Sequence, residues 1–395
     1  MHCCAFILRY NDSMKKRLVA ALGTAASATP IVRRHLSPAF LGRITCFQRH
    51  CPITRSLPEH IGHDGFYFPI HEPTTLQRMA PLCLDREDID AVWPQFVLNQ
   101  KGMKIRTQPV FLAGIRDARV LAGGLAIRSR DNFLFYEPFH EPMHVNCLRH
   151  PLLPSADRYL RGDYIHFVSL WWPSHFHWLL DVLPRLSIVE QFERLRRMPF
   201  LVPTGLTHQQ RESLELLGIK SDQLIELNGN FNIERLYYPS TLSLSGNPTP
   251  TAVRWLRERF ASRSRAQKKL YVSRRDASTR RIVNEDDLVR ELVPFGFEVV
   301  SLVKMRFSEQ IHLFSDAAII LGPNGAGLTN SLFAPPGATV VELFSRNYVN
   351  GAIWALANVC GHKYGLLVGP HHAQDIEVDI GKLLRLLHLL GISKH

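Results

Sequence analysis

The stretch LGPNGAGLTNSLF, Leu321–Phe333, decides the fold of this chain. It continues an apolar, β-branched run, Ala317–Leu321, that has the length of a buried strand. It then leads into a helix-like segment, Leu328–Phe333. A strand, a glycine-rich turn and a helix start in this order can cradle an anion, because glycine lets the backbone approach a ligand and the free N–H groups of a helix start favour negative charge. The spacing matches neither the dinucleotide fingerprint nor a P-loop, so an ordinary turn remains the alternative.

The residues around this stretch alternate between strand and helix patterns. The patterns predict strands at 270–273, 298–302, 317–321, 339–344 and 364–368, with helices between them and a last helix at 376–390. Such an alternation predicts a parallel sheet that binds ligands at the carboxyl ends of its strands. The glycine turn lies at such an end, and so do four cations: Arg274, Arg275, Lys304 and Arg306. Their convergence on one rim favours an anionic ligand.

The first half of the chain shows a shorter alternation after a region of β-like runs. Residues 110–136 predict a meander of hairpins, since short apolar runs are broken by Arg-Asp and Gly-Gly. Residues 164–170 predict a strand and 177–192 a helix, while Pro248 and Pro250 mark a crossover. We therefore predict a poorly ordered leader at 1–55 and two α/β domains at 56–250 and 251–395.

The composition is that of a globular, basic protein. The chain of 395 residues has a net charge of +12, which suits an anionic small molecule, nucleic acid or an acidic membrane face. No nucleic-acid-binding motif is present. The seven cysteines include no C-x-x-C pair, which argues against a disulfide framework and a zinc site. No apolar run reaches the roughly 18 residues of a spanning helix. We therefore expect a cytoplasmic protein.

A histidine and an aspartate stand at helical spacing in HFHWLLDVLPRL. His177 and Asp181 are four residues apart and share one face of the predicted helix. This is the spacing of a base and the residue that orients it, although a lone His in an aromatic stretch is more often structural. Sugar rings stack on aromatic faces, and Trp172 is our candidate for such a contact, with its aromatic neighbours in the core.

Two segments resemble glycosyltransferase family 61. They are LYVSRR at Leu270–Arg275 and FSEQIHLFSDAAIILGPNGAGLTNSLFAPPGATVVELF at Phe307–Phe344, and HFHWLLD looks like the family's His-x-x-x-Asp motif. The resemblance covers about 166–367. It implies an α/β fold of GT-B type, with two Rossmann-like domains facing across a cleft and the β-rich meander before them. In that fold the N-terminal domain holds the acceptor and the C-terminal domain the nucleotide-sugar.

The resemblance also implies a function. It suggests an inverting, metal-independent glycosyltransferase that moves a sugar from a nucleotide-sugar to a hydroxyl of a glycan or lipid-linked saccharide. No cofactor is expected besides this co-substrate, and no nucleic acid. By analogy, the glycan is a bacterial surface polysaccharide or capsule assembled at the inner face of the cytoplasmic membrane, with the basic surface contacting anionic lipid. The alternative is a non-catalytic nucleotide- or glycan-binding protein of the same fold.

The resemblance assigns site residues as well. Asp181 and His177 are the catalytic pair, and no metal site is expected. The only Asp-x-Asp sequence, Asp88-Ile89-Asp90, reads as a charged surface segment. The loop usually carries His where this chain has Asn324. The donor-binding residues are Arg274, Gly322, Asn324, Gly325, Ala326, Gly327, Asn330 and Glu342, the last of them toward the ribose.

Overall fold

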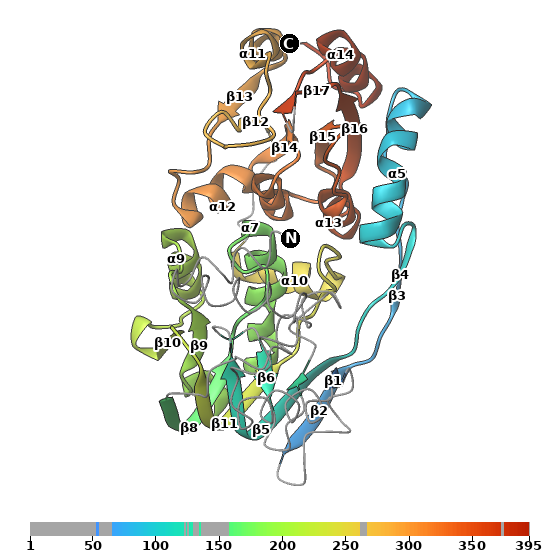
Figure 1. Ribbon diagram of the computed structural model, residues 1–395. Helices are drawn as coiled ribbons and strands as arrows, with labels where there is room; N and C mark the ends of the chain where they lie inside the picture. Colours follow the sequence, from blue (N-terminus) through green and yellow to red (C-terminus); the bar gives the residue numbers. More distant parts are fainter. Residues whose placement is uncertain are drawn as a thin grey trace, which may run out of the picture.

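The computed structural model describes residues 53–54, 65–121, 124, 126–128, 134–135, 158–260, 267–372 and 375–394. Nearly all of the expected leader lies outside these residues. The described part is a mixed α/β protein with two large sheets, one above the other in Figure 1. Helices fill the space between the sheets and cover the far face of the upper one.

The upper sheet is parallel and has five strands. They are β12 (Lys268–Val272), β13 (Phe297–Val300), β14 (Ala317–Pro323), β15 (Thr339–Ser345) and β16 (Lys363–Gly369). The predicted strands are confirmed to within a few residues. Their spatial order is β13-β12-β14-β15-β16. The direction of winding therefore reverses between β12 and β14, and ligands of doubly wound sheets bind in the crevice at such a point.

Helices follow the strands of the upper sheet on both faces. They are α11 (Glu285–Leu292), α12 (Phe307–Ser315), the 3₁₀ helix η7 (Ala326–Phe333), α13 (Ala352–Cys360) and α14 (Ile380–Leu389). A short 3₁₀ turn, Val293–Phe295, follows α11. The last helix begins four residues later than predicted, because Asp375–Ile376 (β18) pairs as a strand with His371–His372 (β17). Asn284 does not cap α11 with its side chain; it bonds the backbone of Val378 in both directions instead.

The lower sheet is mixed. Among the described residues it contains β1 (Ile53–Thr54), β2 (Phe66–His71), β5 (Val110–Leu121), β6 (Ala126–Arg128), β7 (Leu134–Phe135), β8 (Arg158–His166), β9 (Phe200–Pro203), β10 (Leu224–Leu227) and β11 (Phe231–Pro239). β5, β6 and β7 are successive antiparallel neighbours, and β11, β8, β9 and β10 are parallel. β5 also pairs with β11, so both kinds of strand belong to one sheet.

One segment of the first half packs on the upper sheet. The chain rises from the lower sheet through β3 (Thr75–Gln77), forms α5 (Arg86–Gln100) beside β16, and returns through β4 (Lys104–Arg106) (Figure 1). Before α5, the backbone of Leu82 bonds Tyr364 and Leu366 along the edge of β16. The rings of Phe96 and Trp354 stack with centroids 5.1 Å apart. This segment therefore covers one edge of the upper sheet.

The helix expected at 177–192 is broken into four short pieces. They are α7 (His175–His177), a π-helical turn η2 (Trp178–Val182), a 3₁₀ turn η3 (Leu183–Arg185) and α8 (Leu186–Val189). The backbone N–H of Leu183 bonds the carbonyl of Trp178, five residues back. Pro184 has no N–H to donate, so the regular ladder cannot run through it, and the wider turn precedes it.

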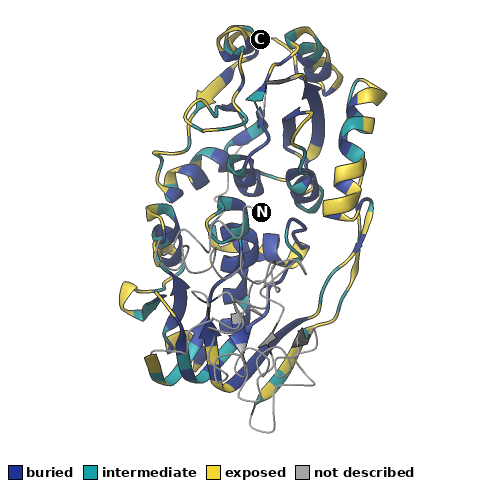
Figure 2. Ribbon diagram, viewed as in Figure 1, coloured by how far each residue is buried: buried dark blue, intermediate teal, exposed yellow. Residues whose placement is uncertain are grey.

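The space between the sheets is a continuous apolar core. One cluster of buried side chains joins Phe167 of the lower half with Phe307 and Trp354 of the upper half, and Figure 2 shows the helices there as mostly buried. The remaining helices of this layer are α9 (His208–Leu216) and α10 (Pro250–Phe260), with 3₁₀ turns at Leu195–Arg197 and Ser221–Gln223. Thr207 and Gln210 form a capping box at the start of α9. The two halves are thus held close together.

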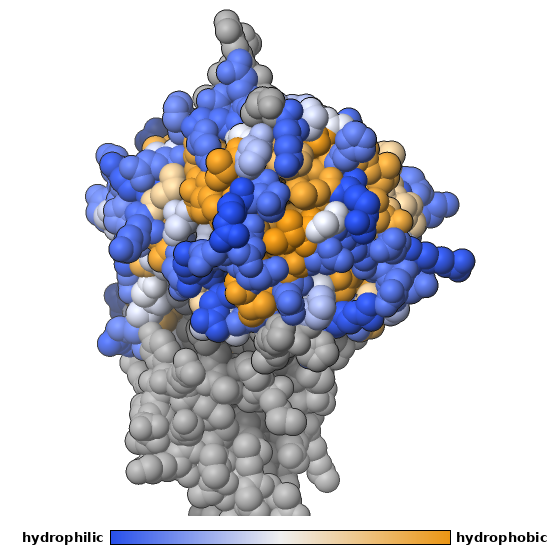
Figure 3. Space-filling model, turned by 90° about the horizontal axis from the view of Figure 1, so that it is seen from above, coloured by the Kyte–Doolittle hydropathy of each residue, from blue (hydrophilic) through white to orange (hydrophobic). Residues whose placement is uncertain are grey.

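The end of the molecule farthest from the lower sheet carries α11 and α14. Seen from above, apolar side chains lie there among charged ones (Figure 3). Val293 and Leu389 are examples, with 60% and 58% of their surface exposed. None of the helices that the structure describes has both the length and the apolar character needed to cross a bilayer.

Candidate functional site

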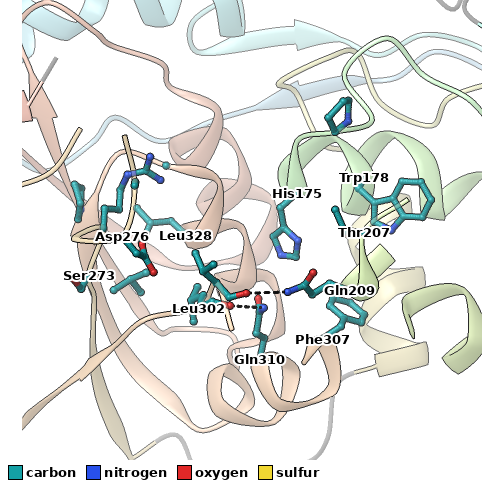
Figure 4. A pocket seen from close by; sticks show the side chains of 18 of the residues that line it. His175, Trp178, Thr207, Gln209, Ser273, Asp276, Leu302, Phe307, Gln310 and Leu328 are labelled. Carbon is teal, nitrogen blue, oxygen red and sulfur yellow. Dashed lines mark hydrogen bonds between the residues drawn. The ribbon is translucent and has the colours of Figure 1, made fainter. Parts of the chain in front are cut away.

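Two cavities meet at the glycine turn between the sheets. The smaller has a volume of about 260 Å³ and the larger about 500 Å³. Gly325 lines both cavities. The smaller one lies at the switch point between β12 and β14, and Figure 4 shows its walls, formed by the upper sheet and by α7 and α9. The predicted rim of the upper sheet therefore borders two adjoining cavities.

Arg274 lies in the smaller cavity and packs on the glycine turn. A Cβ added at residue 325 would lie 2.4 Å from Arg274 Nη1, so a larger residue there would displace the end of the arginine side chain. The φ of Gly325 is 177°, which is ordinary extended backbone. The glycine thus lets Arg274 lie directly against the turn. Burial, and then the charge of Arg280, lower the pKa of Arg274.

Arg280 lies in the larger cavity on the other side of the turn. Its backbone has a φ of 59°, in the left-handed region that side chains rarely adopt. One terminal nitrogen donates to Asn324 Oδ1 at 3.0 Å, and the guanidinium carbon lies 4.7 Å from the centre of the Tyr348 ring. The second cation of the site is therefore fixed by an amide and an aromatic ring.

The four cations predicted for the rim have different surroundings. Arg275 pairs with Glu285 and Asp286, and Arg306 pairs with Glu212. Lys304 lines neither cavity. Arg274 and Arg280, by contrast, make no ion pair with a carboxylate of the described residues, and the Nε of each is buried without a partner. Two half-buried cations without a carboxylate partner among the described residues are costly, which makes this place a candidate anion site.

His177 and Asp181 form the predicted pair. His177 Nδ1 and Asp181 Oδ2 are 2.6 Å apart. The Asp181 side chain is 1% exposed and that of His177 19% exposed, and His177 lines the larger cavity. A ring nitrogen that faces a buried carboxylate carries the proton, which leaves Nε2 as the acceptor. Ser245 Oγ lies 3.4 Å from the same Nδ1.

Trp172, which was expected at the acceptor, lies away from the cavities, and Trp171, which was expected in the core, lies at one of them. Trp172 is partly buried against two core clusters and lines neither cavity. Trp171 lines the larger cavity, and its ring centre is 6.2 Å from that of His177. The residue chosen from the sequence is thus one position away from the aromatic side chain at the cavity.

Several predicted donor-binding residues lie behind the cavity walls. Glu342 is fully buried in the middle of β15 and bonds Asn324 and Tyr364, so it does not reach a ribose. Asn330 is fully buried between His175 and Gln310. Gly322 lines neither cavity, whereas Ala326 lines the larger, Gly327 the smaller and Asn324 the larger.

A chain of polar side chains crosses the floor of the smaller cavity. His175 Nε2 lies 2.8 Å from Asn330 Oδ1, and Asn330 donates to Gln310 at 2.7 Å. Gln310 in turn donates to the carbonyls of Leu302 and Met305. His175 and Gln310 approach from opposite walls in Figure 4. Burial lowers the pKa of His175, so it is neutral and ties the walls together.

Asp88 is not a surface residue. It is buried in α5, with one oxygen 2.9 Å from Lys382 Nζ, whereas Asp90 is mostly exposed. The Asp-x-Asp sequence is thus part of the contact between α5 and α14. Among the described residues no group of three or more His, Cys, Asp or Glu side chains could hold a metal ion.

Sequence reasoning missed Arg280, His175, Trp171 and Ser245. Arg280 stands in a loop after β12 with no motif of its own, and only the fold brings it to the turn. His175 could have been suspected, because it precedes His177 by two residues in an aromatic stretch. Ser245 lies in the crossover between the halves, where the sequence pattern gives no contact information.

Comparison with known proteins finds a family model that matches the central part of the chain. Residues 175–341 match the family model Glycosyltransferase 61. This range contains His177, Asp181, Arg274, Arg280 and the glycine turn, and it ends one residue before Glu342.

Animal and plant glycosyltransferases are similar over short stretches. Protein O-linked-mannose beta-1,4-N-acetylglucosaminyltransferase 2 of Takifugu rubripes is 41% identical over 71 residues, 17% of this chain and 12% of that protein. EGF domain-specific O-linked N-acetylglucosamine transferase of Gallus gallus is 36% identical over 76 residues, 18% and 14% of the two chains. Beta-1,2-xylosyltransferase of Arabidopsis thaliana is 25% identical over 124 residues, 28% and 23%. The chain thus spans less than a quarter of the length of each of these relatives.

Proposed function

We propose that the glycosyltransferase 61 domain at residues 175–341 transfers a sugar from a nucleotide-sugar to a hydroxyl of a glycan, with inversion at the anomeric carbon. One observation carries this proposal. Arg274 and Arg280 flank Gly325 without a carboxylate partner among the described residues, and His177 with its buried Asp181 faces the adjoining cavity. An anion site and a proton acceptor thus stand beside one another.

The donor's diphosphate is placed by charge. Its negative oxygens fit at Gly325, between Arg274 on one side and Arg280 on the other, where charge-assisted hydrogen bonds are strongest. The nucleoside occupies the smaller cavity, whose walls include the apolar side chains of Val272, Leu302 and Leu328. The sugar then points into the larger cavity, toward His177.

The chemistry follows from these positions. The acceptor hydroxyl oxygen bonds to the anomeric carbon while the bond from that carbon to the phosphate oxygen breaks. His177 Nε2 takes the hydroxyl proton, and Asp181 holds the resulting imidazolium through Nδ1–H. The extra charge on the leaving diphosphate meets Arg274 and Arg280. No metal takes part in this scheme, and Asp181 is too buried to receive the proton directly.

The arrangement of the two sheets supports a GT-B type of fold. The carboxyl ends of β12 and β14, and the turn that follows β8, meet at the cavities from opposite sides. In this assignment the upper sheet belongs to the donor domain and the lower sheet to the acceptor domain. α5 is an addition from the first half that seals the edge of the donor domain.

The names of the relatives suggest the first sugars to try. Two of them transfer N-acetylglucosamine and one xylose, by their names. The acceptor is a glycan or a lipid-linked saccharide. A bacterial surface polysaccharide gains no support from these animal and plant relatives, and that role, the membrane contact and the cytoplasmic location stay predictions.

Release of nucleoside diphosphate tests the proposal. The protein is incubated with UDP-N-acetylglucosamine, UDP-xylose and further nucleotide-sugars, without and with a mixture of glycan acceptors. We expect slow release with one donor that an acceptor accelerates, and a product of inverted configuration by NMR. Tight nucleotide binding without release from any donor would favour the non-catalytic alternative.

A further inference from the structure

Glu342 is a buried carboxyl group with both oxygens occupied. It is 0% exposed in the middle of β15. Tyr364 OH donates to Oε2 at 2.5 Å, and Asn324 Nδ2 donates to Oε1 at 2.6 Å. Its role therefore has to pass through one of these neighbours, and only Asn324 lines a cavity.

The neighbours of Asn324 fix the orientation of its amide. An ionised carboxylate only accepts hydrogen bonds, and a guanidinium only donates them. Glu342 and the carbonyl of Asn350, at 3.2 Å, therefore require the NH₂ end, and Arg280 requires the oxygen. Because all three contacts demand one orientation, the amide cannot turn over without losing them.

Arg280 depends on this amide. Its left-handed backbone, with a φ of 59°, is a strained conformation that the surroundings must hold. Its side-chain contacts include the bond to Asn324 and the face of Tyr348. We propose that Glu342 is a positioning residue, which holds the Asn324 oxygen toward Arg280 and so aims the Arg280 guanidinium at the diphosphate. This inference rests on the donor site proposed above.

The groups around Glu342 come from three elements. Tyr364 faces it from β16, Asn324 from the glycine turn, and the charge of Arg280 from the loop after β12. Burial raises the pKa of Glu342 to about 7, and these three groups oppose the rise. Protonation of Glu342 removes the negative charge that strengthens the bond from the Asn324 NH₂, so the relay from Glu342 through Asn324 to Arg280 is strongest above that pH and weakens below it.

Exchanging the polarity of the pair tests the relay. In Glu342→Gln the charge-assisted bond to the Asn324 NH₂ becomes at best a bond between two amides, and only when the new NH₂ turns to Tyr364 Oη, so Asn324 is held less firmly toward Arg280. In the double variant Asn324→Asp with Glu342→Gln, the new carboxylate accepts from the new amide and from Arg280, which restores these two bonds and leaves the Asn350 carbonyl without its donor. We expect Glu342→Gln to weaken binding of UDP and of inorganic pyrophosphate about tenfold by calorimetry, the size of one lost hydrogen bond. The double variant should return to within about threefold of the wild type. A double variant as weak as the weaker single variant overturns the proposal.

Two further substitutions, at Arg280 and at Asn330, test whether Glu342 acts by positioning Arg280. On an Arg280→Ala background Glu342→Gln should change pyrophosphate binding less than twofold, and a full tenfold loss there would show that Glu342 acts without Arg280. Asn330→Asp, the same change at another buried Asn of the turn, is the matched control and should not rescue Glu342→Gln.

A second substitution covers the case in which Glu342→Gln does not fold. Neutral His, like Asn, has one donor and one acceptor nitrogen, so Asn324→His should bind pyrophosphate like the wild type, and Asn324→Leu about tenfold more weakly. Equal binding by the Leu and His variants would contradict the relay.

The outcome for the proposed function is read separately. If the wild type binds neither UDP nor pyrophosphate, the donor site is wrong. The relay is then decided by urea unfolding without ligand, where Glu342→Gln and Asn324→Asp should each destabilise and the double variant should be more stable than their sum predicts. Additive effects there would refute it.

Discussion

The two walls of the site treat charge in opposite ways. On the upper wall Arg274 and Arg280 have no carboxylate partner among the described residues, whereas on the lower wall His177 is bonded to the buried carboxylate of Asp181. One wall lacks an anion and the other has its charge already compensated. The difference indicates that the upper wall is completed by a ligand and that the lower wall handles a proton.

Removing the imidazole should have the largest effect. His177→Ala should lower turnover by about 10²–10⁴-fold, the usual cost of losing a general base. Nucleotide affinity should stay within a factor of a few, because the cations are untouched. Steady-state kinetics and calorimetry measure both. His208→Ala, an exposed His on α9, is the control and should behave like the wild type.

Replacing the buried Asp181 carboxylate by an amide of the same shape should have a similar effect on turnover. Asp181→Asn leaves Nδ1 without its anionic partner, so the imidazolium loses its stabilisation, and turnover should again fall about 10²–10⁴-fold. Circular dichroism checks the fold. If this variant and His177→Ala both fold and turn over normally, the pair is structural.

Removing a cation from the upper wall should weaken the binding of nucleoside diphosphate. Arg274→Ala should cost about 1.5–3 kcal/mol of nucleoside diphosphate affinity, the size of a charge-assisted hydrogen bond to the leaving group. Arg275→Ala, the neighbouring residue that is paired with Glu285 and Asp286, is the matched control and should leave affinity nearly unchanged. Equal losses in both variants would mean that general positive charge, and not the cavity, binds the anion.

Glu342 should make the folded state sensitive to pH. Its pKa is raised from 4.5 to about 7 by burial, so the folded protein keeps a proton that the unfolded chain releases. Stability should therefore fall as the pH rises from about 4.5 to 7, by at most about 3 kcal/mol. Urea unfolding at several pH values measures the slope, which Glu342→Gln should reduce. An unchanged slope in that variant would assign the effect to other groups.

Chelation should have the smallest effect. Turnover in excess EDTA should equal that without it, because the proposed scheme stabilises the diphosphate with two arginines. The measurement is the initial rate with and without EDTA, followed by addition of Mg²⁺ or Mn²⁺. Loss of turnover that a metal restores would contradict the scheme.

On both walls, residues that belong to local sequence patterns could be predicted, and residues that depend on tertiary placement could not. Repeating strand and helix patterns located β12 to β16, the glycine turn and Arg274, because local periodicity determines these elements. His177 and Asp181 were found through their spacing, although the helix is interrupted at Val182 by the demands of Pro184. Arg280 and Trp171 depend on tertiary placement, which no local pattern records. Glu342 was recognised but assigned to the wrong surface, since burial behind Asn324 follows from packing.

The course of α5 bears on how the two halves can move. On its side, Trp93, Phe96 and Trp354 form an aromatic contact that water cannot replace. On the opposite side, polar contacts join α9 to α12 and the loop before it: Glu212 accepts from the backbone N–H of Phe307, and Gln209 donates to the carbonyl of Val303. Water substitutes for such bonds at little net cost.

The chain of the first half therefore reaches across to the second. It leaves the lower sheet through β3, forms α5 at the edge of the upper sheet, and returns through β4, so two covalent connections join the sheets on this side (Figure 1). Moving the sheets apart here requires α5 to leave its place beside Trp354 or the ribbon of β3 and β4 to change its course. In mechanical terms, α5 is a clasp.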